Sequence, residues 1–295
     1  MTDRRRMRAG SRAWRSLHMI SGALTACFLL APAIAAAEDQ PPAAQLSICA
    51  AEHNESAAAV IAACTALIEP GRLDAKELSL VYAYRALGYE RQDDFNRAIA
   101  DANQAIKLDA TNAVAFHRRG DLYKILRQDD LALADFNEAI RLDPKTPLYF
   151  INRSNVYLDM HQYDLALRDI DEALQLDPKD EREAIVNRCT VLTFKGDLTA
   201  AMADCQKGLQ QWPGDPYPLS QVAFLYFKMD KFDDSIAAYD KVLAVPNLGA
   251  DDPYEKAYPL YGRGLAKMKK GDKAGGEADM AAAVALRKDI ARDFE

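Results

Sequence analysis

Residues 147–180 read PLYFINRSNVYLDMHQYDLALRDIDEALQLDPKD, and this stretch holds two helical patterns separated by a polar turn. Apolar or small side chains recur every three or four residues in each half, which is the spacing of one face of a helix. They are Phe150, Ser154 and Tyr157 before the turn at 161–162, and Ala166, Ile170 and Ala173 after it. Asp177–Pro178 ends the second pattern, because proline cannot continue a helix. The stretch therefore predicts one antiparallel helical hairpin.

The same pattern recurs with a period of 34 residues, which is typical of stacked helical hairpins. The six windows are 79–112, 113–146, 147–180, 182–215, 216–249 and 257–290. Five of them carry an Arg at position 7 and an Asp at position 23: Arg85/Asp101, Arg119/Asp135, Arg153/Asp169, Arg188/Asp204 and Arg263/Asp279. The fifth window loses both charges together, with Val222 and Ala238 in their place. This joint loss predicts structural ion pairs between the two helices of each hairpin.

The repeat resembles the tetratricopeptide repeat family, and the second window is among the better matches. Matching positions in that window are Phe116, Gly120, Tyr123, Ala132, Phe136, Ala139 and Pro144. The fifth window departs from the pattern at Ser235 and Pro246, and the sixth departs at Gly276. The resemblance implies an all-α fold, a right-handed superhelical α-solenoid of stacked antiparallel helix pairs over 79–295. Residues 38–78 are Ala-rich and are expected to form an N-terminal capping hairpin and linker.

Residues 1–37 have the pattern of a signal peptide, with six arginines in 4–15, an apolar stretch, and Ala35–Ala36–Ala37 before Glu38. Two alternatives stay open. The stretch could remain as a membrane anchor, or Cys27 in a lipobox-like Leu-Thr-Ala-Cys could carry a lipid. Removal of this segment, which has a net charge of +5, would take the formal net charge from −7 to −12. Such acidity argues against nucleic acid and anionic membranes as partners. We expect an exported, periplasmic protein with no membrane span after cleavage.

Four cysteines follow that segment as two local pairs, Cys49/Cys64 and Cys189/Cys205. Each pair places one cysteine on each helix of a single hairpin. The spacing therefore favours these two disulfides among the three possible connectivities. Both would form in an oxidising compartment. The alternative is four reduced core cysteines, since free cysteine packs as a small hydrophobic side chain.

No catalytic constellation stands out in the sequence. His53, His117 and His161 are isolated and lack the spacing of metal ligands. P-loop, nucleophile-elbow and kinase motifs are absent from the sequence. We therefore expect no cofactor, no metal site and no enzymatic activity.

In tetratricopeptide repeat proteins, the first helix of each hairpin lines a concave groove. Carried onto this chain, the groove would hold Phe194, Tyr217, Phe224 and Phe227, an aromatic patch suited to partner binding. The same helices would present Asn152, Asn155 and Asn187, with Asn152 and Asn187 placed to contact a peptide backbone. The alternatives are that the rings pack against neighbouring helices or lie under the insertion 250–256, and that the asparagines satisfy neighbouring helices.

Family members that clamp a C-terminal carboxylate use basic residues and asparagines on these helices. This chain has Asp121 and Glu183 at two such positions, where they would repel a carboxylate, so this binding mode is not expected. The prediction is a non-enzymatic scaffold or adaptor that binds a peptide segment or a partner helix in the groove. The alternative is a structural subunit of a cell-envelope assembly complex that uses convex or edge surfaces. The sequence does not predict an oligomeric state.

Overall fold

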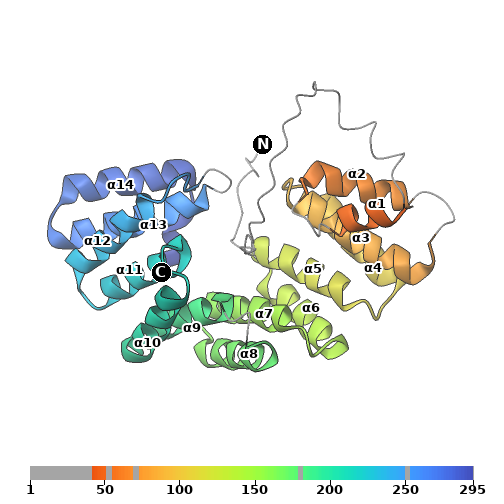
Figure 1. Ribbon diagram of the computed structural model, residues 1–295, viewed down its shortest axis with the longest axis horizontal. Helices are drawn as coiled ribbons and strands as arrows, with labels where there is room; N and C mark the ends of the chain where they lie inside the picture. The colour runs from red at the N-terminus through yellow and green to blue at the C-terminus, as the bar shows by residue number, and fades with distance from the viewer. Residues whose placement is uncertain (1–41, 51–54, 69–72, 179–181, 250–252, 295) are drawn as a thin grey trace, which may run out of the picture. The chain divides into compact units, whose positions relative to one another are not determined.

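Helices and short turns alternate along the chain that the computed structural model describes, which is residues 42–50, 55–68, 73–178, 182–249 and 253–294 (Figure 1). These ranges hold fourteen α-helices and one 3-10 helix, and none of their residues lies in a β-strand. The expected signal peptide with Cys27, and residues 250–252 of the insertion, lie outside these ranges. The chain divides into two compact units, whose boundary falls between Asn152 and Arg153 inside one helix.

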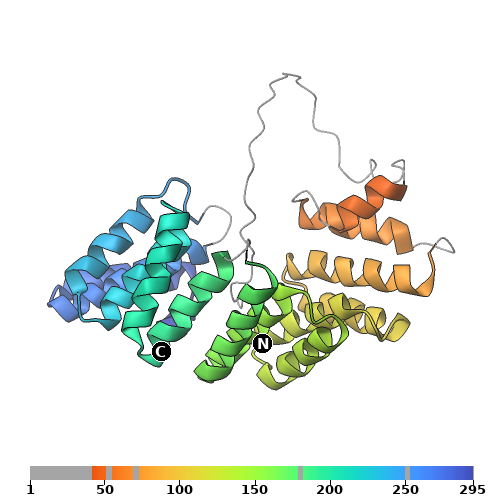
Figure 2. The same ribbon diagram turned by 60° about the horizontal axis from the view of Figure 1, so that its bottom comes forward.

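The N-terminal unit, up to Asn152, is a succession of helices from α1 to α6 in which each packs against the next. Its helices are α1 (Pro42–Cys49), α2 (Ala57–Ile68), α3 (Ala75–Glu90), α4 (Phe95–Leu108), α5 (Ala113–Ile125), α6 (Asp129–Leu142) and the first part of α7 (Pro147–Asp159). Figure 2 shows α1 and α2 (orange) against α3 from a second direction. Helices α3 and α5 also contact each other, so the first helices of these hairpins share a face.

The C-terminal unit, from Arg153 onward, continues in the same way from α8 to α14. Its helices are the rest of α7, α8 (Tyr163–Leu176), α9 (Arg182–Lys195), α10 (Leu198–Gln211), α11 (Pro216–Lys228), α12 (Phe232–Leu243), α13 (Tyr254–Lys270), α14 (Lys273–Leu286) and the 3-10 helix η1 (Ile290–Phe294). Helix α11 contacts both α9 and α13. These three helices therefore form one face of the unit, which we call the first-helix face.

The prediction of an all-α solenoid built from stacked helix pairs is confirmed. The turn expected at 161–162 separates α7 from α8, and each later window likewise holds one first helix and one second helix. Within the described ranges, no helix is both long enough and apolar enough to cross a membrane.

Small residues let the two helices of a hairpin approach closely. The alanines at position 20 (Ala98, Ala132, Ala166 and Ala201) are all fully buried. The two helices of the last hairpin approach even more closely, because a Cβ atom on Gly264 would lie only 2.9 Å from the carbonyl oxygen of Gly276. Glycine at these two positions therefore brings backbone against backbone, which no larger residue allows.

In each of the six windows, the turn between the two helices contains one residue in the left-handed backbone region, at position 15. These residues are Asp93, Arg127, His161, Gly196, Asp230 and Gly271, with φ between 57° and 92°. Only two of the six are glycines, although glycine adopts this conformation at the least cost. The repeated backbone conformation, rather than a repeated residue type, thus closes each hairpin.

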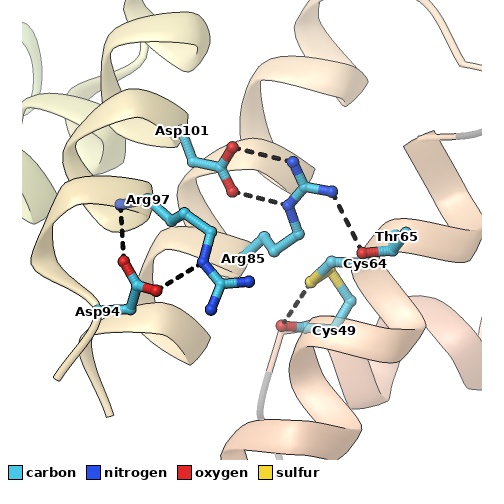
Figure 3. Close-up of polar contacts among 7 residues, drawn as sticks. All are labelled: Cys49, Cys64, Thr65, Arg85, Asp94, Arg97 and Asp101. Atoms are coloured by element: carbon cyan, nitrogen blue, oxygen red, sulfur yellow. Dashed lines mark hydrogen bonds and ion pairs between the residues drawn. A yellow bond between two sulfur atoms is a disulfide. The ribbon is translucent and has the colours of Figure 1, made fainter. Parts of the chain in front are cut away.

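In the five windows that carry them, the Arg at position 7 and the Asp at position 23 meet across the hairpin in a two-point contact, shown for Arg85 and Asp101 in Figure 3. Arg85 donates from Nε and Nη2 to the two carboxylate oxygens of Asp101, at 2.7 and 2.9 Å. The same paired geometry joins Arg119 to Asp135, Arg153 to Asp169, Arg188 to Asp204 and Arg263 to Asp279. Burial opposes ionisation of Asp279, but hydrogen bonds from Arg263 and Lys267 lower the pKa of its carboxyl.

In four of these arginines, the third guanidinium nitrogen reaches back to the preceding hairpin. Nη1 donates to Thr65 from Arg85 (Figure 3), to Asn103 from Arg119, to Asp171 from Arg188 and to Asp240 from Arg263. Asn103, Asp171 and Asp240 all stand at position 25 of the window before the arginine. One side chain therefore fixes the register within a hairpin and also ties it to its neighbour.

The fifth hairpin replaces this polar link by apolar packing. Val222 and Ala238 are both buried, and Val222 packs in one cluster with Cys189 and Cys205 of the fourth hairpin. The sulfur atoms of Cys189 and Cys205 lie at bonding distance, with their Cα atoms 5.4 Å apart. Cys49 and Cys64 are joined in the same way between α1 and α2, with a Cα separation of 4.8 Å (Figure 3).

Replacing Arg119 by Val is expected to destabilise the N-terminal unit, because the buried Asp135 carboxylate would lose its partner. Arg119→Val/Asp135→Ala copies the apolar fifth hairpin and should be more stable than Arg119→Val alone. We expect an interaction energy of about 1–3 kcal/mol from this double-mutant cycle, measured by urea unfolding. If the two single effects simply add in the double variant, the two side chains do not stabilise each other.

We expect all four cysteines to resist alkylation in the denatured, unreduced chain and to become modified after reduction, as counted by intact mass. Because the bridges close short loops of 15 and 16 residues, reduction should also lower stability. Each bridge of this loop length contributes about 3 kcal/mol in the chain-entropy description. Alkylation of the four thiols without reductant would show that they are free core cysteines.

Candidate partner-binding face

Three of the four aromatic residues selected from the sequence gather on the first-helix face of the C-terminal unit. The ring of Phe224 on α11 lies 5.2 Å from that of Phe194 on α9 and 6.4 Å from that of Phe227, one turn further along α11. Phe194 and Phe227 are partly exposed. We call these three side chains the aromatic cluster. Rings of this kind supply much of the binding energy at protein interfaces when a partner covers them.

Phe224 itself is not open to a partner, which corrects the expectation of an exposed ring. Only 1% of its surface is exposed. Phe294 of η1 packs edge-on against it, with ring centroids 5.4 Å apart. The covering group is therefore the segment that follows α14. Neighbouring helices also contribute, through Phe194, whereas residues 250–252 of the insertion lie outside the described chain.

Tyr217 lies apart from the aromatic cluster in a row of polar contacts. Its hydroxyl donates to Oδ1 of Asn187 at 2.9 Å, and Nδ2 of Asn187 donates to Oδ1 of Asn155 at 3.0 Å. Burial raises the pKa of the Tyr217 hydroxyl. The row links α11, α9 and α7, so the Asn187 amide already bonds to neighbouring helices on both sides. This favours the interpretation in which the asparagines hold the stack together.

Asn152, in the N-terminal unit, is also engaged internally. Its Nδ2 donates to Nε2 of His117 and to Oδ1 of Asp121, both at 2.8 Å. The ring of Tyr149 lies 4.9 Å from that of His117. His117, Asp121 and Asn152 are each at most 5% exposed, so the three form a buried polar cluster. A peptide backbone does not reach Asn152 in this arrangement.

Burial determines the protonation of this cluster. It lowers the pKa of His117 well below its ordinary value, with the Arg118 charge acting in the same direction. It raises the pKa of Asp121 to about 6, although Arg118, Lys124 and the bond from Asn152 oppose the rise. His117 is therefore neutral at pH 7 and can accept the amide hydrogen of Asn152 at Nε2.

Lys228 places a positive charge beside the aromatic cluster. Its Nζ lies 5.4 Å from the centroid of the Phe194 ring and 5.3 Å from that of Phe224. The side chain is exposed and belongs to the last turn of α11. A cation over aromatic faces is a modest attraction inside the protein, and it also offers a carboxylate of a partner an ion pair next to apolar surface.

A shallow depression of about 370 Å³ lies elsewhere on the C-terminal unit, at the α7–α8 turn and the end of α9. It is lined by His161, Gln162, Tyr163, Asp164, Leu165 and Lys195. Lys195 and Asp164 pair across it at 2.7 Å. In the described ranges, no three His, Cys, Asp or Glu side chains come together as metal ligands would.

The buried cluster predicts opposite pH effects from two substitutions. Burial depresses the pKa of His117 in the folded chain, whereas histidine in the unfolded chain has a pKa of about 6.5. As the pH falls below about 6.5, the unfolded chain binds a proton that buried His117 does not, so the folded state loses stability. The raised pKa of Asp121 means that its contribution is lost as pH rises toward about 6.

His117→Gln keeps an acceptor for Asn152 but does not titrate, so its thermal midpoint relative to wild type should rise as pH falls from about 7 to 5. Asp121→Asn should show the reverse trend over about pH 4 to 7, because it removes the buried charge that appears at higher pH. Melting followed by circular dichroism gives both differences. Profiles that stay parallel to the wild type would show that these two groups do not titrate differently in the folded chain.

Family models described as tetratricopeptide repeat match residues 113–146 and 147–180, which coincide with the second and third windows. No curated protein sequence matches the chain. Among solved structures, a tetratricopeptide repeat protein from Parabacteroides merdae ATCC 43184 is similar, with 19% identity and a TM-score of 0.66. The match covers 81% of this chain and 91% of that one.

Two further solved structures are also similar. PilW, described as a widely conserved type IV pilus biogenesis factor, has 19% identity and a TM-score of 0.59, over 74% of this chain and 97% of its own. PilF of Pseudomonas aeruginosa has 17% identity and a TM-score of 0.54, over 74% and 96%. At 17–19% identity, the similarity to these structures shows the fold alone. With two repeats matched in register and the hairpin recurring along the described chain, the protein is a member of the tetratricopeptide repeat family.

Proposed function

We propose that this protein is a non-enzymatic interaction scaffold that binds a peptide segment or a partner helix on the first-helix face of its C-terminal unit. The observation that carries the proposal is the aromatic cluster beside Lys228. Phe194 and Phe227 remain partly exposed at the surface of an otherwise well-packed stack. Partly exposed aromatic side chains next to a flexible cation are typical of binding hot spots.

The chemistry of this surface favours apolar and acidic groups on the partner. The rings offer burial, and Lys228 offers charge at the rim of the cluster. The net charge of the whole chain is −7, so a local positive group stands out against an acidic background. Local charge of this kind contributes to orientation and to the association rate more than to affinity.

We also propose that the scaffold works outside the cytoplasm. Two cysteine pairs at bonding distance support an oxidising compartment, since disulfides are rare in most cytosolic proteins. The expected signal peptide at 1–37 points the same way. Helices α1 and α2, joined by Cys49–Cys64, would then form the N-terminal capping hairpin expected within residues 38–78.

The second candidate is a structural subunit of a cell-envelope assembly complex that uses the second helices or the edges of the stack. Exposed aliphatic side chains on second helices favour it, namely Leu131 on α6, Leu165 on α8, and Val284 and Leu286 on α14, which are 36–49% exposed. Scattered exposed aliphatic residues of this kind are common on protein surfaces. The aromatic cluster therefore supports the first candidate more strongly.

A photocrosslinking amino acid placed at Phe227 and, in a matched control, at Val284 tests which surface meets the partner in the exporting cell. We expect crosslinks to a partner from position 227 and none from position 284. Lys228→Glu should reduce the crosslinks from position 227, because it reverses the charge beside the rings. Crosslinks confined to position 284 would favour the envelope-subunit role and contradict binding on the first-helix face.

A further inference from the structure

The segment that follows α14 folds back onto the first-helix face. Helix α14 ends at Leu286, and the backbone N–H of Arg287 closes it by donating to Ala283. After one turn the chain forms η1, in which Ile290 is fully buried. Ile290 packs in one cluster with Ala223 of α11 and Tyr258 of α13. This residue is the fixed anchor of the segment, which we call the strap (residues 287–294).

The tip of the strap places an aromatic ring among the rings of the face. Phe294 lies 4.6 Å from Tyr258, 5.2 Å from Tyr261 and 5.4 Å from Phe224, measured between ring centroids. Two helices, α11 and α13, supply these rings. Unlike Ile290, Phe294 remains partly exposed. The tip is therefore seated on the surface of the face, whereas the anchor is part of the core.

Charge accompanies the aromatic contact. Arg287 lies over the ring of Tyr254, 4.6 Å from its centroid, and its Nε donates to Asp289 at 2.9 Å. Its Nη1 pairs with Asp293 only at 3.6 Å, and this buried nitrogen has no hydrogen-bond partner in the described chain. A buried guanidinium donor without a hydrogen bond is costly. A carboxylate that approached Nη1 more closely than Asp293 would gain that bond.

We propose that the Asp293–Phe294 tip is a built-in ligand of this face, and that the natural partner is an acidic segment with an aromatic residue, which displaces the tip. The proposal rests on the proposed function and names the chemistry of the partner. The partner's aromatic side chain takes the place of Phe294 among Tyr258, Tyr261 and Phe224. Its carboxylate takes the place of Asp293 at Arg287. Ile290 stays in the core, so the strap opens at its tip without unfolding the last hairpin.

The test uses the full chain and a fluorescein-labelled peptide, Asp-Ile-Ala-Arg-Asp-Phe, which copies residues 289–294. Fluorescence anisotropy compares its affinity for the wild type and for Phe294→Ala. We expect the variant to bind at least about tenfold more tightly, because a site that is occupied internally is available only for a fraction of the time. A peptide with Ala in place of Phe should bind neither protein, and one with Asn in place of the last Asp should bind more weakly.

Equal affinity of the peptide for the wild type and for a folded Phe294→Ala, or no binding to that variant, would overturn the proposal. Ile290→Ala serves as the contrasting variant, since loss of the buried anchor should lower the thermal midpoint. If Phe294→Ala does not fold, hydrogen exchange on the wild type decides. Excess peptide should speed exchange in residues 287–294 if it displaces the tip, and unchanged exchange would contradict displacement.

The outcomes separate this proposal from the proposed function. A cellular partner that crosslinks at Phe227 equally well in the wild type and in Phe294→Ala would keep the proposed function and overturn displacement of the strap. Absence of any crosslinked partner at Phe227, with the peptide still preferring Phe294→Ala, would count against the proposed function and leave the strap as a ligand-like segment.

Discussion

The paired hydrogen bonds between an arginine and an aspartate are the interaction on which the hairpin stack depends. The alanines at position 20, and Gly264 with Gly276 in the last hairpin, set how closely two helices approach, but apolar contact alone permits sliding. A planar guanidinium facing a carboxylate permits one register, because both oxygens must be met at once. Asp135 and Asp169 are buried, so a change of register that left either carboxylate without its arginine would lower the stability of the folded state. The third nitrogen extends this constraint to the neighbouring hairpin.

Much of this fold could be predicted from the 34-residue period of the sequence, because the same pattern of apolar and small residues recurs in each window. The joint loss of Arg and Asp at Val222 and Ala238 also pointed to a spatial pair. The sequence did not predict the bonds from four of the arginines to the preceding hairpin, although three of the acceptors are polar residues at position 25 of the preceding window. That position holds Asn103, Asn137, Asp171, Gln206, Asp240 and Ala281 in the six windows, so its link to the next arginine is weak as a pattern. The left-handed turn residue was hidden for a similar reason, since Asp, Arg, His and Gly all occupy it.

Less of the candidate binding face could be predicted from the sequence. Helical spacing brought Phe194, Phe224 and Phe227 together on one face, as the ring distances show. Nothing in the repeat pattern indicated that Phe294 would cover Phe224, because Phe294 lies beyond the sixth window and the strap is positioned by tertiary contacts of Ile290. The amides of Asn152 and Asn187 presented a related difficulty. An amide suits water, a peptide or a neighbouring helix equally well, and only the packed arrangement shows which one it meets.

The apolar junction between the fourth and fifth hairpins has a consequence for how the C-terminal unit responds to ionic strength. Asp171 and Asp240, which take the third arginine nitrogen at other junctions, have side chains about half exposed to solvent (54% each). Dissolved ions screen such contacts. The packing of Val222 against the Cys189–Cys205 cluster contains no charge to screen. The ion pair between Arg182 of α9 and Asp215, the N-cap of α11, also crosses this junction, but its side chains are only 15% and 13% exposed. Concentrated electrolyte should therefore weaken this junction less than the neighbouring junctions, where Arg188 and Arg263 meet exposed carboxylates.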